Sequence, residues 1–180
     1  MKYALSPLSL ASAIALAFSG SANAIDGTIT ITGEITDTTC SISVNGASAS
    51  GAVSLPAVST SSLSTAGMTA GTTPFSIALS GCSGSVLSTA RTWFEPGVNV
   101  DSTTGRLNNT GSATNVQVQL LNKNLGAIVA GGANVATQND VGEDISSGSG
   151  TLNYYAQYYA TSAATAGAVT TSVEYTIVYD

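Results

Sequence analysis

The sequence contains no histidine and little charge of either sign. Of its 180 residues, 4 are Lys or Arg and 10 are Asp or Glu, so that 8% of the chain is charged, against about 25% in an average soluble domain. The lack of an imidazole excludes mechanisms that use histidine as a general base or metal ligand, which include most hydrolase mechanisms. The net charge of −6 argues against nucleic acid as a partner, because phosphate recognition requires a basic surface.

Sequence motifs of other catalytic chemistries are missing as well. The chain has no nucleophile elbow, no P-loop and no dinucleotide-binding glycine motif. Asp140, Glu143 and Asp144 lie in a Gly- and Ser-rich stretch, but they do not have the spacing of a calcium-binding loop, so a solvated loop is the simpler interpretation. We therefore predict that the protein is not an enzyme and holds no cofactor or metal.

Residues 1–24 have the pattern of a secretory signal peptide. Lys2 provides a positive charge, the stretch 11–18 is apolar, and residues 22–24 (ANA) form a typical cleavage site. The apolar stretch is shorter than the roughly 20 residues that span a bilayer. We predict that residues 1–24 are removed during export and that residues 25–180 form one domain with its extension.

The sequence has only two cysteines, Cys40 and Cys82. An exported chain without histidine or a third cysteine cannot complete a zinc site, so a disulfide between the two is the natural interpretation. In the chain-entropy model, closing a loop of this length stabilises the fold by about 4 kcal/mol.

Beyond residue 24, the chain consists of short runs in which apolar and polar residues alternate, separated by Gly, Asn, Asp and Ser. This period of two is typical of strands with one buried face, and the spacing of the runs favours an all-β antiparallel sandwich. The one candidate for a helix, residues 125–138, is interrupted by Gly131 and Gly132. The predicted strands are 28–35, 40–44, 53–58, 74–80, 92–95, 115–121, 152–159 and 169–179.

The first and last of these strands are the most regular. In the first, isoleucine and glycine occupy every second position from residue 25 to residue 35, and polar residues occupy the others. In the last, one face consists of Val169, Thr171, Val173, Tyr175, Ile177 and Tyr179. Because no further strand follows, we expect an open sheet edge beside an open strip of core. The first strand could fill this opening in a neighbouring molecule and give a head-to-tail polymer, or it could close its own sandwich.

Several segments share their residues and spacing with one known family. They include residues 27–40 (GTITITGEITDTTC), the strand PFSIALSG before Cys82, a penultimate aromatic, Tyr179, and a glycine fourteen residues from the carboxyl terminus, Gly167. Together they resemble the shaft subunits of chaperone-usher fimbriae, the type 1 pilus group of Gram-negative bacteria. Residues 93–97 (WFEPG) and 153–180 look most like the major pilins of N-acetylglucosamine-binding enteric fimbriae.

The resemblance implies an incomplete immunoglobulin-like sandwich that lacks its last strand and is completed in trans by a donor strand. Residues 25–35 would be the donor extension and residues 36–180 the pilin domain. In the extension, Ile25, Ile29 and Ile31 would fill pockets, and Gly27 would stand where the family keeps a small residue. The acceptor groove and chaperone-binding strand would comprise Gly167, Val169, Val173, Tyr175, Ile177, Tyr179 and Asp180.

The resemblance also implies partners and a location. A periplasmic chaperone would lend a strand to the groove, and two of its basic residues would hold the terminal carboxylate of Asp180. An outer-membrane usher would then exchange that strand for the extension of the next subunit. The expected product is a fimbria on the cell surface that supports adhesion and binds no nucleic acid.

A second function remains open, that of a monomeric secreted carbohydrate-binding β-sandwich. Tyr154, Tyr155, Tyr158, Tyr159 and Trp93 could form a platform on which sugars stack. The simpler interpretation is that the tyrosines of one strand face the core and the surface in turn. A single domain also leaves no room for a lectin domain ahead of a pilin domain, so we expect sugar recognition to belong to another subunit.

Overall fold

The computed structural model describes residues 39–84 and 88–180, together with Thr30, Thr32 and Ile35. The chain divides into two units, residues 1–34 and residues 35–180, and all the strands and helices of the described residues belong to the second unit. The predicted signal peptide and the predicted donor residues Ile25, Gly27, Ile29 and Ile31 lie outside the described residues.

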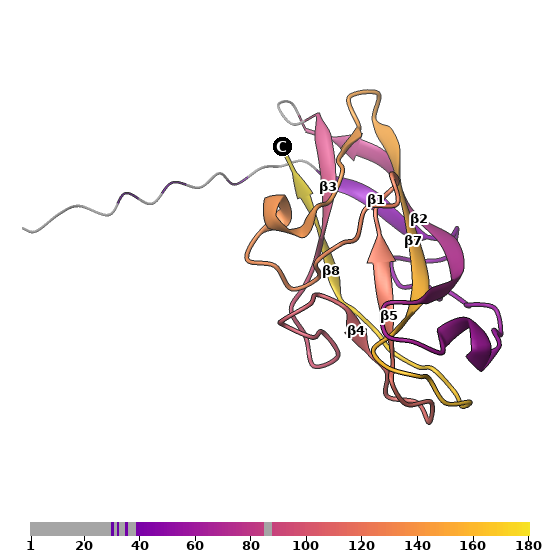
Figure 1. Cartoon of the computed structure of the whole chain (residues 1–180). Coiled ribbons are helices and arrows are strands. Elements are labelled where there is room, and N and C mark those ends of the chain that lie inside the picture. The colour runs from indigo at the N-terminus through magenta and orange to yellow at the C-terminus, as the bar shows by residue number, and fades with distance from the viewer. Residues whose placement is uncertain (1–29, 31, 33–34, 36–38, 85–87) are drawn as a thin grey trace, which may run out of the picture. The chain divides into compact units, whose positions relative to one another are not determined.

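Two antiparallel sheets make up the second unit (Figure 1). The larger has the strand order β1-β2-β7-β5-β4 and the smaller has the order β6-β3-β8. The strands are Thr39–Val44 (β1), Thr69–Ser83 (β2), Thr89–Phe94 (β3), Leu107–Asn108 (β4), Val116–Leu121 (β5), Glu143–Asp144 (β6), Ser149–Ala160 (β7) and Tyr175–Tyr179 (β8). Two short 3-10 helices, Thr60–Leu63 (η1) and Val135–Gln138 (η2), lie in connections. No helix among these residues has the length and apolar character that a membrane span requires.

The hydrophobic core lies between the two sheets because alternate residues of each strand point inward. Ile77 and Leu79 of β2 and Leu152 of β7 are at most 2% exposed. Phe94 of β3 meets Tyr154 of β7 edge to face, with ring centroids 5.3 Å apart and an interplanar angle of 83°. This edge-to-face geometry is favourable for aromatic rings and joins the two sheets.

The predicted disulfide between Cys40 and Cys82 is present. It links β1 to β2, which are neighbours in the larger sheet and pair in antiparallel register, with Ile42 opposite Leu79. Both cysteines pack against the core. The disulfide therefore holds β1, one of the two outer strands of the larger sheet, in place.

Two of the predicted strands differ from the observed ones, one wholly and one in part, and the short strands β4 and β6 have no predicted counterpart. Those within β1, β2, β3, β5 and β7 are confirmed, whereas the predicted strand 28–35 falls largely outside the described residues. Residues 53–58 and 169–174 were wrongly predicted as strands, since neither belongs to a sheet of the described structure. Both segments keep alternating burial, but a strand also needs a backbone partner, which alternation cannot supply. The candidate helix 125–138 is reduced to η2.

A partly buried hydrogen-bonded group also connects the sheets. The Tyr154 hydroxyl donates to Asp140 Oδ1 at 2.9 Å, and Asp140 Oδ2 accepts from the backbone N–H of Thr92 in β3 at 2.8 Å. Burial, and then the charge of the Asp140 carboxylate, raise the pKa of Tyr154 far above its ordinary value. Tyr154 therefore remains a hydrogen-bond donor at any physiological pH.

We expect the free energy of unfolding to fall as the pH rises above about 10, because tyrosine in the unfolded chain then ionises while Tyr154 in the folded chain stays protonated. In Tyr154→Phe this decline should be shallower by up to about 1.4 kcal/mol per pH unit. At pH 7 the same variant should be about 1–3 kcal/mol less stable, because Asp140 loses a donor. Urea denaturation from pH 7 to pH 11 measures both effects, and equal slopes in the two proteins would contradict the assignment.

Candidate functional site: a groove between two sheet edges

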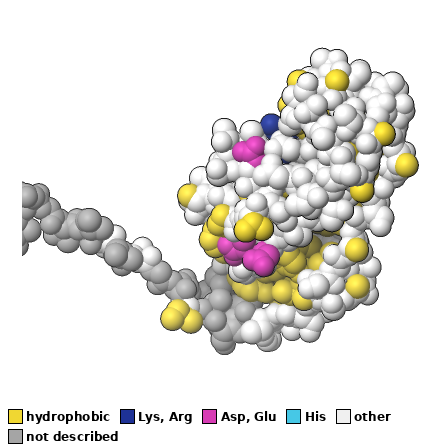
Figure 2. All heavy atoms as spheres, turned by 90° about the horizontal axis from the view of Figure 1, so that it is seen from below, with side chains coloured by type: hydrophobic (Ala, Val, Ile, Leu, Met, Phe, Trp, Pro, Cys, Tyr) yellow, Lys and Arg dark blue, Asp and Glu magenta, His cyan; other side chains and the backbone are white. Residues whose placement is uncertain are grey.

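A long groove opens between the outer strands of the two sheets. Its volume is about 1390 Å³, and β8 and β1 contribute to its opposite sides. Figure 2 shows hydrophobic side chains gathered in a hollow, with acidic side chains beside it. The floor belongs to the core of the domain and includes Val44, Ile77, Phe94, Val118 and Leu120. The groove therefore leaves one strip of the core without a cover of protein among the described residues.

Strand β8 forms part of one wall of the groove. Its backbone pairs with β3 along its whole length, and its other edge borders the groove, since β8 is the outer strand of its sheet. Tyr175, Ile177 and Tyr179 are half-buried and pack against the core. Burial raises the pKa of Tyr175 and of Tyr179 above the usual tyrosine value. Both hydroxyls are therefore neutral at physiological pH.

Residues 169–174 extend this wall beyond β8. Val169 and Val173 pack against the core, while Thr170 between them is held by the loop 109–113. Thr110 N donates to Thr170 O at 2.8 Å, and Thr170 N donates to Asn109 Oδ1 at 2.7 Å. The wall is thus fixed by individual hydrogen bonds in place of a regular ladder.

Residues 49–55, which follow β1, line the opposite side of the groove. Val53 and Leu55 pack against the core, whereas their neighbours are exposed. Residues 53–58 form no backbone-to-backbone hydrogen bond within the described part of the chain. Across the groove, the Tyr175 hydroxyl donates to Ala49 O at 2.6 Å. Both walls consequently carry extended backbone with unused hydrogen-bonding groups.

The groove is apolar with a weakly acidic rim. Glu95 and Glu174 are the charged residues among the described residues that line it, and the Glu95 carboxylate accepts a hydrogen bond from Thr176 Oγ1 at 2.7 Å. In the described ranges, no group of three His, Cys, Asp or Glu side chains could hold a metal ion. Apolar floor and unpaired backbone edges together suit an extended peptide segment, which would add a strand to the sheets.

The edge of β3 that faces away from β8 is closed by side chains. β6 pairs with its first two residues, Asp140 Oδ2 takes the N–H of Thr92, and the Gln138 side chain bonds to both Phe94 N (3.0 Å) and Phe94 O (2.7 Å). Gln138 is fully buried. These two side chains take the place of a neighbouring strand beyond β6, so no strand can add to this part of β3.

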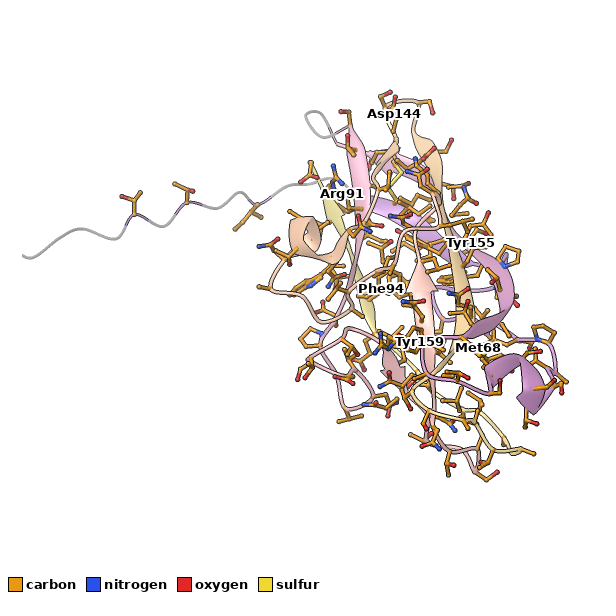
Figure 3. All side chains as sticks on the ribbon, in the orientation of Figure 1. Met68, Arg91, Phe94, Asp144, Tyr155 and Tyr159 are labelled. Atoms are coloured by element: carbon orange, nitrogen blue, oxygen red, sulfur yellow. A yellow bond between two sulfur atoms is a disulfide. The ribbon has the colours of Figure 1, made fainter. Side chains whose placement is uncertain are left out.

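Five of the seven predicted groove residues line the groove, namely Val169, Val173, Tyr175, Ile177 and Tyr179. Gly167 and Asp180 do not. Gly167 lies where a Cβ would be 2.5 Å from Ala113 N, so it permits close packing of two loops. The Asp180 side chain pairs with Arg91 Nε at 2.9 Å, and Arg91 lies close to the carboxyl end of β8 (Figure 3). The role of these two residues toward a donor or chaperone strand stays a prediction.

The aromatic platform is not assembled. Tyr154 is 2% exposed and belongs to the core, Tyr158 lines the groove, and Tyr155 and Tyr159 alternate with them along β7 (Figure 3). The guanidinium of Arg106 lies 3.9 Å from the centroid of the Tyr159 ring and covers that face. The Trp93 indole donates to Gly132 O. The five aromatics therefore do not share one surface.

The acidic cluster does not form a calcium site either. Asp140 is engaged by Thr92 and Tyr154, the Glu143 carboxylate pairs with Lys123 at 3.0 Å, and Asp144 Oδ1 accepts from Ser146 N. Each carboxylate thus has a separate structural partner. The interpretation of a solvated loop does not hold for Asp140, whose carboxylate is partly buried and bonded to Thr92 and Tyr154.

The sequence did not reveal two features of the groove. Residues 49–55 form a wall because they follow β1 on the open side of the core, and the alternation of Val53 and Leu55 was the only available signal. The buried hydroxyl of Thr171, which bonds to none of the described residues, belongs to the inward face of the last predicted strand. The alternating sequence assigns Thr171 to that face. That its hydroxyl lacks a hydrogen-bond partner among the described residues depends on the surrounding fold.

Comparison with known proteins gives consistent matches. The family model described as Type-1 fimbrial protein, A (FimA) matches residues 55–180. The major fimbrial subunit SMF-1 of Stenotrophomonas maltophilia is 53% identical over 168 residues, which cover 88% of this chain and 95% of that protein. The F17 fimbrial protein of Escherichia coli is 43% identical over 171 residues, covering 92% and 94%.

Among solved structures, the P pilus rod subunit PapA has a similar fold. The TM-score is 0.58 with 20% sequence identity, and the match covers 78% of this chain and 99% of that one. At this level of identity the match concerns the architecture. It agrees with the incomplete immunoglobulin-like sandwich expected from the sequence.

The close approach of Gly167 to Ala113, just before the wall segment 169–174, can be tested by substitution. Gly167→Ala should lower the free energy of unfolding by about 1–3 kcal/mol, because the added methyl group would overlap the backbone of Ala113. Gly97→Ala is the matched control, since a Cβ at Gly97 meets nothing within 4 Å. Urea denaturation of the two variants measures the difference. If they are equally stable, the two loops do not depend on the glycine.

Proposed function

This chain belongs to the Type-1 fimbrial protein, A family, and we propose that its subunits join head to tail when residues 25–35 of one subunit enter the groove of the next. The chain is a structural subunit of a surface fimbria and polymerises with related subunits. The groove between β8 and β1 is the observation that carries the proposal, because it combines an apolar floor with unpaired backbone edges. A monomer gains nothing from such a combination.

An extended segment in the groove would form hydrogen bonds on both of its edges. One edge would face β8 and residues 169–174, and the other would face β1 and residues 51–55. Residues 53–58, whose sequence alternates like that of a strand, would then acquire a partner. Each backbone hydrogen bond contributes about 0.5–1.5 kcal/mol net, so that a ladder along the whole groove would give a slowly dissociating contact.

Residues 25–35 have the composition that this groove accepts. Ile25, Ile29 and Ile31 would point to the floor, and burying each is worth about 1.5–3 kcal/mol. Asp26 and Glu34 have the opposite parity and would face solvent, away from the apolar floor. Gly27 shares the parity of the isoleucines and would lie against the groove wall without a side chain. Since few of these contacts involve charge, the joint should depend weakly on salt.

The open groove also supports a need for protection before assembly. An exposed apolar strip beside unpaired edges is prone to aggregation, and a periplasmic chaperone that lends a strand would cover it. We propose that residues 1–24 direct export, that such a chaperone holds the subunit in the periplasm, with basic residues at the terminal carboxylate of Asp180, and that an outer-membrane usher exchanges its strand. The chain would have no catalytic role of its own.

Ile29→Asp should block polymerisation, because a carboxylate would have to enter the apolar floor of the groove. We expect the rate of subunit joining to fall roughly a hundredfold or more. Thr28→Asp is the matched control, since residue 28 has the opposite parity and would face solvent. Polymer ladders on non-reducing gels, followed over time, measure both variants. Polymerisation of Ile29→Asp at the rate of Thr28→Asp would rule out residues 25–35 as the donor.

Expression of the full chain in a periplasm without a dedicated chaperone separates this function from that of a monomeric carbohydrate-binding sandwich. A subunit with an open groove should be degraded or should aggregate, because its core strip has no cover. A sandwich closed by its own first strand would accumulate as a soluble monomer. Size-exclusion chromatography of periplasmic extracts distinguishes the two, and a stable monomer would favour the second function.

A further inference from the structure

Thr171 interrupts an otherwise apolar row along the groove wall. The inward positions of this wall are Val169, Thr171, Val173, Tyr175, Ile177 and Tyr179, all of which line the groove. The Thr171 hydroxyl oxygen is buried and bonds to none of the described residues. A buried hydroxyl without a partner is costly, and an apolar residue of similar shape, such as valine, would avoid that cost. The Thr92 hydroxyl in β3 is in the same condition, but of these two only Thr171 lines the groove, where a group of another molecule could reach it.

The donor extension has a row that matches the wall in length and spacing. Its apolar-parity positions are Ile25, Gly27, Ile29, Ile31, Gly33 and Ile35. Both rows consist of every second residue of an eleven-residue segment, 25–35 and 169–179. Two rows of equal period can pair along their whole length only in one register for each strand direction.

The surrounding ladders indicate which direction to expect. Every strand pair in both sheets is antiparallel, so a strand added beside β8 would continue the pattern. Aligned end to end in this direction, Ile25 lies opposite Tyr179, and Gly33 lies opposite Thr171. Residues directly opposite each other in adjacent strands point to the same side. The one polar position of the wall thus meets a position of the donor that has no side chain.

We propose that Thr171 determines the specificity of the groove for its donor strand, by forming a hydrogen bond from its hydroxyl to the donor backbone at Gly33. This inference rests on the proposed function. It adds the register of the donor strand and names Thr171 as the residue that selects this register. At glycine no Cβ stands between the hydroxyl and the backbone. A donor with a branched residue at this position would leave the hydroxyl buried and unpaired.

The first test uses Thr171→Val, a substitution that should stabilise the free acceptor and weaken its complex with the donor peptide. The acceptor is the full chain carrying Ile29→Asp, which cannot donate its own strand, and the probe is a fluorescent peptide of residues 25–35. Thr171→Val should raise the urea midpoint of the free chain, because an unpaired hydroxyl is removed. It should also accelerate release of the peptide about two- to tenfold, because the bond to the donor is lost.

Thr170→Val is the matched control, since Thr170 belongs to the same wall but its bonds to the loop 109–113 use its backbone, and its side chain is exposed. It should change neither the urea midpoint nor the release rate. A release rate for Thr171→Val equal to that of Thr170→Val would overturn the proposal. A purely structural role of the hydroxyl would lower the urea midpoint, and this result would overturn it too.

The second test determines the register by exchanging sizes across the contact. A peptide with Gly33→Val should bind the Thr171 acceptor at least tenfold more weakly than the natural peptide, and Thr171→Gly in the acceptor should restore much of the binding. A peptide with Gly27→Val, which the proposal places opposite Ile177, should not be rescued by Thr171→Gly. Rescue of Gly27→Val alone would overturn the proposal, because Gly27 faces Thr171 only if the donor runs parallel to β8.

The natural peptide separates the role of the donor segment from that of Thr171. If it binds the acceptor no better than a peptide of scrambled sequence, the proposed donor segment is wrong and the specificity inference falls with it. If the natural peptide binds well but the Thr171 variants behave like the controls, the result supports residues 25–35 as the donor. It contradicts the role of Thr171 in specificity.

Discussion

Backbone N–H and C=O groups at a sheet edge need hydrogen-bond partners, and the groove borders two edges, those of β8 and β1, whose partners within the described fold are missing. Between them lies a strip of core that includes Ile77 and Phe94. A peptide strand satisfies both needs at once, since its backbone pairs with the edges and its side chains cover the core. The polymer can thus be understood as the completion of a fold by a second copy of the same chain.

The other contacts of the domain direct strand addition to this one place. The side chains of Gln138 and Asp140 occupy the second edge of β3, so that a strand cannot add there. The disulfide fixes β1 against β2, and the loop 109–113 fixes residues 169–174. The walls of the groove are therefore held in position before any strand enters, which reduces the ordering cost of joining.

The low charge of the sequence agrees with this architecture. Glu95 and Glu174 lie at the groove, and the three basic residues after residue 24, Arg91, Arg106 and Lys123, each bond to partners within the domain. Contacts built from backbone ladders and small apolar side chains need little charge and respond weakly to salt. Ser and Thr, 50 residues in all, supply exposed strand faces without adding charge.

Local pattern in the sequence determined the strands that lie within β1, β2, β3, β5 and β7, the disulfide and the parity of the groove wall, because alternation with a period of two and the cysteine count are properties of neighbouring residues and composition. Val173, Tyr175 and Ile177 could be assigned to the inward face on that basis. Gly167 and Asp180 could not be placed, since their contacts with Ala113 and Arg91 join residues far apart in the chain. Tertiary structure alone decided that the predicted strands 53–58 and 169–174 belong to no sheet, that residues 49–55 and 169–174 form walls of the groove, and that the Thr171 hydroxyl is buried without a partner among the described residues. Whether an alternating segment is a strand depends on what lies beside its backbone, and only the folded chain brings those neighbours together.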